Sequence, residues 1–488
     1  MAAYVLAQGA AHPDKIALIV GGAAPQSFTY AELQSRVRLI GAGLMQIGVR
    51  SGDRVLMRVG NTPDFPMVYL GAIAIGAVPI PTSTALTQPE VTRIAQETRP
   101  VLIVADTGIT LPEGQLPVLY TNEIARFASR PPCDFDLGDP HRPAYIVYTS
   151  GTAGAPRAVV HAHRAIWARQ SMFKDWYDLR RDDRVLHAGA FNWTYTLGTG
   201  LMDPWTIGAT AIVPSSDTEL HDIPVLLRAH SATIFAAAPG VYRKLLKHDM
   251  SGLDALRHGV SAGEKLPEST ALDWQAATGT RIYEAFGASE CSTFISAAPA
   301  RPAKPDQIGF VQAGRKATVR HEEHGVSDGE IGEISVHKDD CGLMLGYLQP
   351  DGHTDLPLND GWFGTGDLAC VDDDGALRYL GRRDDMMNAG GYRVSPIEVE
   401  NVLATHPDVT EVACCVLQVK RDVTVIGAFY TGPNVIDEED LQTHAARQLA
   451  RYKCPKIYTR VNALPRGANN KLKRRDLRET WEAAHGQT

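Results

Sequence analysis

Between Tyr148 and Arg157 the chain reads YTSGTAGAPR, directly after the apolar stretch Ala144–Val147. The apolar stretch predicts a buried β-strand, and the glycines and small hydroxylated residues predict a turn that leaves it. Backbone N–H groups and hydroxyls in such a turn can surround phosphate oxygens, and Arg157 adds a fixed positive charge. No G-x-x-x-x-G-K-[ST] pattern is present, so this is not a Walker loop. Taken alone, the stretch is equally compatible with an ordinary polar turn.

Outside this stretch, short apolar runs alternate with helix-like stretches, which predicts an α/β fold. The strand candidates are Val55–Val59, Val101–Ala105, Tyr145–Tyr148, Ala211–Val213 and Thr233–Ala237. The helix candidates, in which apolar residues recur three and four positions apart, are Tyr30–Ile47, Pro89–Glu97, Ile223–His230 and Val241–Lys247. After about Leu380 a polar cluster precedes two further apolar runs, Val412–Val419 and Val423–Tyr430. We therefore place a domain boundary near Leu380.

Composition excludes several classes of protein. The 48 basic and 56 acidic residues leave a formal charge of −8, opposite in sign to what a nucleic-acid binder needs. The longest apolar run, Phe65–Pro81, is interrupted by glycines and prolines, so we expect a buried helix followed by a strand and no membrane span. No secretory signal begins the chain, and the seven cysteines form no C-x-x-C pair. We expect a cytoplasmic protein without nucleic-acid or membrane partners.

Four further segments stand out: Gly259–Glu264 (GVSAGE), Tyr283–Glu290 (YEAFGASE), Trp362–Leu368 (WFGTGDL) and Leu464–Arg475 (LPRGANNKLKRR). Each alone fits an ordinary feature such as a glycine turn, a helix cap or an exposed basic tail. In this order, together with the phosphate-loop stretch, they resemble the adenylate-forming superfamily of acyl-CoA synthetases, peptide-synthetase adenylation domains and luciferases. The resemblance covers nearly the whole chain. It implies a large multi-layer α/β body over 1–381, a hinge at 382–384 and a small mobile α+β domain over 385–488.

The resemblance implies an ATP site with three parts. The phosphate loop would use Thr149, Ser150, Gly151, Thr152, Gly154 and Arg157, and the adenine ring would face Ala262, Gly263 and Glu264. Asp367 would accept hydrogen bonds from both ribose hydroxyls, which suits a carboxylate with two oxygens, and Arg382 would be a second nucleotide contact. The family loop reads Y-T-S-G-T-T-G-x-P-K-G, so this chain departs from it at Ala153, Arg157 and Ala158.

The resemblance also implies the first half-reaction, in which a carboxylate attacks the α-phosphorus of ATP and pyrophosphate leaves. Ser289 would contact the α-phosphate, Glu290 would hold Mg²⁺, and Lys471 would bridge the attacking carboxylate and the α-phosphate. No general base is needed, because the carboxylate is already ionised at neutral pH. Electrostatic neutralisation of two anions would dominate catalysis. Asn470 stands where the family has glycine.

The second half-reaction implied by the resemblance is attack of a thiol, that of coenzyme A, on the acyl-adenylate. The small domain would swing about Asp384 so that Gly390, Gly391 and Tyr392 line the tunnel of the thiol. Glycine permits close approach of the pantetheine arm, although two adjacent glycines also suit a simple tight turn.

Similarity to the benzoate-CoA-ligase branch predicts the acyl pocket. Its residues would be Trp193, Thr194, Tyr195, Gly287, Thr293 and Phe294. Aromatic walls favour a small acid, either aromatic or short, branched or hydroxylated, over a long fatty acid. The hydroxyls of Ser292 and Thr293 could meet a polar substituent. Core packing of Trp193 and Tyr195 is the competing interpretation.

Two alternative functions stay open at this point. The departures at Ala153, Arg157 and Asn470 would suit a nucleotide-binding sensor with weakened catalysis. A stand-alone adenylation enzyme that loads a carrier-protein thiol is the other alternative. The neutral Asn192 stands where amino-acid-activating members carry an aspartate, which disfavours an α-amino acid substrate. A monomer and a homodimer are both compatible with the sequence.

Overall fold

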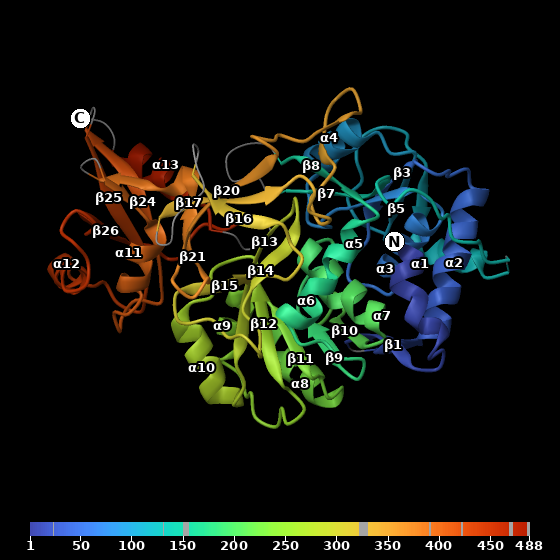
Figure 1. Ribbon diagram of the computed structural model, residues 1–488, viewed down its shortest axis with the longest axis horizontal. Helices are drawn as coiled ribbons and strands as arrows, with labels where there is room; N and C mark the ends of the chain where they lie inside the picture. Colours follow the sequence, from blue (N-terminus) through green and yellow to red (C-terminus); the bar gives the residue numbers. More distant parts are fainter. Residues whose placement is uncertain are drawn as a thin grey trace. The chain divides into compact units, whose positions relative to one another are not determined.

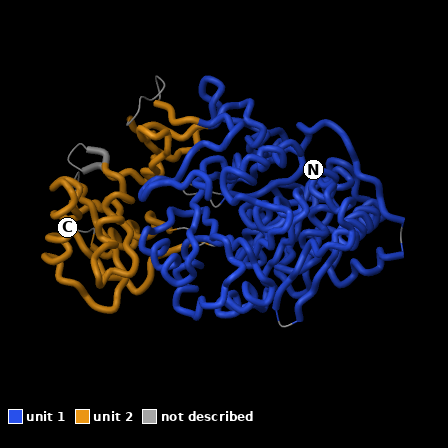
Figure 2. Tube along the Cα trace, turned by 60° about the horizontal axis from the view of Figure 1, so that its bottom comes forward, with its two compact units in different colours: residues 1–149, 156–317, 336–363 blue, residues 150–155, 318–335, 364–488 orange. Residues whose placement is uncertain are grey.

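The computed structural model describes residues 1–22, 24–129, 131–149, 156–321, 330–389, 392–420, 423–467 and 472–485 (Figure 1). The chain forms two compact units, coloured separately in Figure 2. Unit 1 comprises 1–149, 156–317 and 336–363, and unit 2 comprises the described residues of 318–335 and 364–488. The predicted hinge at 382–384 lies inside unit 2. Pivoting there, and the mobility of 385–488, stay predictions.

The central sheet of unit 1 has its described strands in the order β15-β14-β13-β12-β11-β9-β10-β1-β2. Neighbours from β13 through β1 are parallel, and β2, β14 and β15 are antiparallel to their neighbours. The bounds are β1 Ile16–Gly21, β2 Gln26–Thr29, β9 Arg184–His187, β10 Thr210–Pro214, β11 Ile234–Ala237, β12 His258–Ala262, β13 Ile282–Ala288, β14 Ser292–Ser296 and β15 Gln307–Val311. The carboxyl ends of parallel strands share one sheet edge, where open α/β sheets bind ligands.

Strand β11 shows why these apolar runs become central strands. Phe235 and Ala237 pack with residues of α8 (Ile223–Ala229), α9 (Pro239–Leu245) and α10 (Glu268–Thr278). Ile234 and Ala236 join a second cluster with Met172 of α6 (Gln170–Asp175). Successive strand residues point to opposite faces, so a strand covered on both sides must be apolar throughout.

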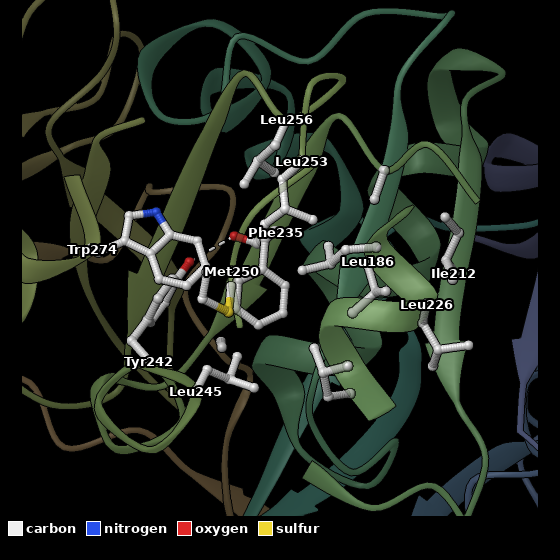
Figure 3. Packing of buried hydrophobic residues seen from close by; sticks show 14 of the residues in the cluster. Leu186, Ile212, Leu226, Phe235, Tyr242, Leu245, Met250, Leu253, Leu256 and Trp274 are labelled. Carbon is white, nitrogen blue, oxygen red and sulfur yellow. Dashed lines mark hydrogen bonds between the residues drawn. The ribbon is translucent and has the colours of Figure 1, made fainter. Parts of the chain in front are cut away.

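The core under α9 and α10 is built round aromatic rings (Figure 3). The Tyr242 and Trp274 rings meet edge to face at 4.7 Å, and Phe235 stacks on Trp274 at 5.6 Å. The Tyr242 hydroxyl donates to the Phe235 carbonyl at 2.7 Å, which satisfies a polar group inside an apolar cluster.

Two smaller sheets complete unit 1, in the orders β4-β3-β5-β6 and β19-β18-β8-β7. Their bounds are β3 Arg54–Arg58, β4 Val78–Pro81, β5 Leu102–Ala105, β6 Val118–Tyr120, β7 Pro143–Tyr148, β8 Ala158–Ala162, β18 Gly346–Leu348 and β19 Thr354–Asp355. The other helices are α1 Ala2–Leu6, α2 Tyr30–Gln46, α3 Asp64–Ala74, α4 Gln88–Thr98, α5 Ala165–Ala168 and α7 Asp203–Ile207. A fully buried π-helix, η3 (Thr196–Met202), leads into α7.

Unit 2 contains a sheet segment and a compact α+β region. The segment runs β17 (Ile331–His337), β20 (Trp362–Val371) and β21 (Leu377–Arg382), of which β17 and β20 extend into residues of unit 1. The α+β region has β22 Met387–Ala389, β23 Tyr392–Val394, β24 Glu411–Lys420, β25 Val423–Thr431, β26 Ile457–Arg460, α11 Pro396–Leu403, α12 Glu438–Ala446 and α13 Arg474–His485. The predicted α/β class with a smaller C-terminal domain is confirmed. Among the described helices, none is long and apolar enough to cross a membrane.

Candidate active site

The described ends of the phosphate-loop stretch are held together by the β7–β8 hairpin. Tyr148 pairs with Ala158 in the antiparallel ladder, and the Thr149 N–H donates to the Arg157 carbonyl at 3.0 Å. The Arg157 N–H donates back to the Thr149 hydroxyl at 3.2 Å. Ser150, Gly151, Thr152 and Gly154 lie outside the described residues, as does Ala153, so their phosphate contacts stay predictions.

Arg157 and Glu290 are brought together by Tyr347 of β18. The Arg157 guanidinium lies 3.7 Å from the centre of the Tyr347 ring, and the Tyr347 hydroxyl donates to Glu290 Oε1 at 2.8 Å. Burial, reinforced by the Glu290 charge, raises the pKa of Tyr347, so its hydroxyl keeps its proton and acts as donor. A planar guanidinium stacks on an aromatic ring better than an ammonium does. This stacking explains why an arginine stands at position 157, where the family has lysine.

Ser289 and Glu290 lie in the turn between β13 and β14, at the carboxyl end of β13. The Ser289 carbonyl accepts a hydrogen bond from His161 Nε2 at 2.7 Å, and the Glu290 carbonyl accepts from the Met344 N–H at 2.7 Å. Gly287 is required by close packing, because an added Cβ would lie 2.4 Å from the Ser292 carbonyl oxygen. Gly287 therefore shapes this turn through its missing side chain.

The predicted adenine-facing turn follows β12. Ala262 ends that strand, and Gly263 has a φ of +97°, a conformation that favours glycine. An added Cβ at Gly263 would lie 2.8 Å from the Trp193 ring, so the indole lies directly against this turn. Glu264 follows it and is half-buried. The structure thus brings Trp193 close to the predicted adenine turn.

In unit 2 the predicted ribose carboxylate is held from both sides. Asp367 on β20 faces Arg382 on β21 in the ladder, and Arg382 Nη1 donates to its Oδ2 at 2.8 Å. The hydroxyl of Tyr379 donates to its Oδ1 at 2.7 Å. Burial raises the pKa of Tyr379 well above its usual range, so this donor also keeps its proton. Tyr379 was not identified from the sequence.

A small cavity lies beside Ser289 in unit 1. Its volume is about 10 Å³, room for one water-sized group. Its lining residues are Tyr145, His161, Arg169, Thr194, Leu197, Met202, Ser289 and Ser292. Of the six residues predicted for the acyl pocket, this set contains Thr194. Leu197 and Met202 come from π-helix η3, which no apolar periodicity in the sequence indicates.

The other predicted pocket residues are not part of this lining. The buried Tyr195 donates its hydroxyl to the Val260 carbonyl at 3.0 Å, and Trp193 meets the Tyr195 ring edge to face at 5.2 Å. Phe294 is fully buried against Phe286, and the Thr293 carbonyl accepts from Arg315. Their role in acid selection stays a prediction.

Unit 1 also has a larger cleft, of about 400 Å³. Asn192 lines this cleft, whereas Thr194 lines the small cavity. The polar part of the cleft wall consists of Asn61, Thr84, Asn192, Ser215, Ser216, Thr218 and Glu219. The chain from Asn192 to Thr194 therefore separates two spaces of very different size.

Five residues of the second unit were predicted to act in mobility or catalysis. Asp384 is exposed in a short 3₁₀ turn, Arg383–Asp385. The backbone of Tyr392 pairs with Ala389 in the β22–β23 ladder. Gly390, Gly391 and Lys471 lie outside the described residues, and so does Asn470.

Two family models match successive parts of the chain. The family model described as AMP-binding enzyme matches residues 5–348, and that described as AMP-binding enzyme C-terminal domain matches 398–471. A 3-hydroxybenzoate–CoA ligase of Aromatoleum sp. (strain CIB) is 30% identical, over 98% of this chain and 95% of the relative. A benzoate–CoA ligase of Thauera aromatica is 30% identical, over 93% of this chain and 90% of the relative. The crystal structure of the anthranilate CoA ligase AuaEII with anthranoyl-AMP superposes with a TM-score of 0.89 at 25% identity, covering 100% and 98% of the two chains.

Proposed function

Because the chain belongs to the AMP-binding enzyme family, we propose that it makes the coenzyme A thioester of a small aromatic carboxylic acid. Its activity is that of an ATP-dependent, AMP-forming acyl-CoA synthetase, with ATP, coenzyme A and Mg²⁺ as co-reactants. The observation that carries the choice of acid is the small cavity beside Ser289, which is lined in part by the rings of Tyr145 and His161 and has room for one water-sized group. It would take a single small substituent of the acid, and it leaves no space for a long flexible chain.

The names of three similar proteins support an aromatic acid as the substrate. Their names specify 3-hydroxybenzoate, benzoate and anthranilate. The small volume of the cavity favours one second candidate, a short hydroxylated acid, whose hydroxyl group would occupy the same space without a ring.

We assign the charge neutralisation of the first half-reaction to three residues. Arg157 and Lys471 would offset the charges of the carboxylate and the phosphates directly, and Glu290 would act through the Mg²⁺ that it holds. Ser289 would orient the α-phosphate. Substrate positioning supplies the remaining rate enhancement, since no proton has to be transferred.

The residues round Glu290 fit Mg²⁺. The described residues form no cluster of three potential metal ligands, and Mg²⁺ is typically held by one or two carboxylates together with waters and substrate phosphates. Tyr347 holds Oε1 of Glu290 by a hydrogen bond, which fixes the orientation of the carboxylate. When bound, Mg²⁺ would neutralise phosphate charge.

For the second half-reaction we propose that Asp384 is the pivot and that Gly390, Gly391 and Tyr392 guide the thiol. The exposed Asp384 side chain leaves the backbone there with few packing constraints. Asp367, oriented by Tyr379 and Arg382, would hold the ribose. We also propose a cytoplasmic location, because all seven cysteines are free thiols, as a reducing compartment requires.

ATP–pyrophosphate exchange across a panel of carboxylic acids tests the proposal. The panel should contain benzoate, the three hydroxybenzoates, short hydroxylated acids and fatty acids of increasing length. We expect exchange with aromatic acids and coenzyme A-dependent release of AMP. Exchange supported by long-chain acids alone would refute the choice of acid. ATP binding without any exchange would favour the sensor function, and AMP release that needs a carrier protein would favour the carrier-loading alternative.

A further inference from the structure

His161, which lines the small cavity beside Ser289, has one ring nitrogen that donates a hydrogen bond and one that can only accept. His161 Nε2 lies 2.7 Å from the Ser289 carbonyl oxygen, and a carbonyl only accepts, so Nε2 carries the proton. Burial lowers the pKa of His161 to about 4, so the ring is neutral and Nδ1 has a lone pair. The side chain is 1% exposed, and Nδ1 has no hydrogen-bond partner among the described residues. An unpaired buried acceptor is costly, so a donor is expected to occupy this position.

Ser292 supplies the complementary group on the same cavity wall. Its Oγ accepts a hydrogen bond from Arg169 Nη1 at 2.5 Å, so the Ser292 hydroxyl proton points to another acceptor. The φ of Ser292 is +60°, which is uncommon for a residue other than glycine. His161 and Ser292 therefore present one acceptor and one donor to a space of one-water size.

Arg169 does not offer its charge to a ligand. Its Nε and Nη2 donate to both oxygens of Asp203, at 2.7 and 2.5 Å, and Nη2 also contacts the Thr199 hydroxyl at 3.2 Å. The Asp203 side chain is fully buried, and the hydroxyl of Tyr177 also donates to it. The guanidinium charge is thus neutralised inside the protein. A second carboxylate on the acid would be buried here without a counter-charge, which is strongly unfavourable.

We propose that this cavity recognises a hydroxyl group on the acid, with His161 Nδ1 accepting its proton and Ser292 Oγ–H donating to its oxygen. A hydroxyl has both a donor and an acceptor, whereas hydrogen, halogen or methyl has neither strong partner. His161 and Ser292 are then specificity residues, and Arg169 is a positioning residue that orients Ser292. This inference rests on the proposed function, because it selects among small acids that the enzyme adenylates.

The test compares kcat/KM for hydroxybenzoates with kcat/KM for benzoate in the same exchange assay. Sites that hydrogen-bond a substrate hydroxyl discriminate strongly against analogues that lack it, and we expect the best hydroxybenzoate to exceed benzoate by about 10- to 100-fold. Ser292→Ala and His161→Phe should reduce this ratio towards one, mainly by losing activity with the hydroxylated acid. Aminobenzoates should fall between, because an aryl amine donates well but accepts poorly.

Thr199→Val is the matched control. It removes a different hydrogen bond to Arg169 from a residue outside the cavity lining, so the ratio should stay as in the wild type. A wild-type ratio near one would overturn the inference without affecting the proposed function, since benzoate would still be activated. A preference for benzene dicarboxylic acids would overturn it as well, because Arg169 would then be reading a charge. An equal fall of the ratio in Thr199→Val would also overturn it. Absence of exchange with every aromatic acid would instead refute the proposed function.

Discussion

The hydrogen bond from Tyr347 to Glu290 leads to the sharpest prediction about catalysis. Tyr347→Phe removes one hydroxyl and keeps the ring on which Arg157 stacks. The lost bond joins a 5% exposed tyrosine to a carboxylate at 2.8 Å. Hydrogen bonds to charged groups contribute about 1.5–3 kcal/mol. At about 1.36 kcal/mol per tenfold in rate, this range corresponds to about 10- to 150-fold.

We expect the lower end of that range, about tenfold, because Glu290 is half-buried and water can replace part of the interaction. The loss should fall on adenylation, and the Mg²⁺ concentration needed for half-maximal rate should rise, because the carboxylate is no longer oriented. Thioester formation from a supplied acyl-adenylate should change little.

The assay is ATP–pyrophosphate exchange as a function of Mg²⁺, with thermal unfolding measured in parallel. Tyr242→Phe is the control: its hydroxyl donates to the Phe235 and Val260 carbonyls in the core, so it should lower stability and leave the Mg²⁺ dependence unchanged. Wild-type exchange and wild-type Mg²⁺ dependence in Tyr347→Phe would show that Tyr347 does not position Glu290. Equal losses in both half-reactions would show that the effect is structural.

Three further predictions concern residues assigned from the sequence. Lys471→Ala should reduce adenylation by about 10²–10³-fold and spare thioester formation from a supplied acyl-adenylate; equal losses in the two steps would contradict alternation of the small domain. Asp384→Pro should do the reverse, because proline fixes φ near about −65° and blocks a pivot, and unchanged steady-state turnover would remove Asp384 from that role. Trp193→Ala should remove the indole that packs against Tyr195 and the Gly263 turn and should admit larger acids, with little change in the apparent KM for ATP, whereas an unaltered acid profile would assign Trp193 to core packing alone.

The strands and helices could be predicted well wherever burial imposes a pattern. The apolar run Thr233–Ala237 corresponds to β11 (Ile234–Ala237), and Tyr30–Ile47 corresponds to α2 (Tyr30–Gln46). The glycine- and proline-containing run Phe65–Pro81 forms helix α3 followed by strand β4, as expected. In each case the buried face of the strand or helix requires apolar residues at a regular spacing, and this spacing can be recognised in the local sequence.

The site was predictable only where a motif supplies the residue. Tyr347 is 57 positions from Glu290 in the sequence, and His161 is 128 positions from Ser289. Such partners are chosen by the tertiary fold, and nothing in their local sequence distinguishes a tyrosine that holds a carboxylate from one that fills a core. Tyr195 illustrates the same difficulty, since a tyrosine suits either a pocket wall or the buried position observed here, where its hydroxyl donates to the Val260 carbonyl.

The π-helix Thr196–Met202 makes the cavity beside Ser289, which we propose as part of the acid site, sensitive to chain length. Its seven residues form wider turns than an α-helix, with hydrogen bonds from residue i to residue i+5. Deleting one residue would let the segment relax to α-helical winding and would rotate Asp203 away from Arg169. Leu197 and Met202 would no longer reach the same wall. New acid selectivity is therefore more accessible through side-chain replacement here than through insertion or deletion, and variant libraries for this enzyme should keep this segment at constant length.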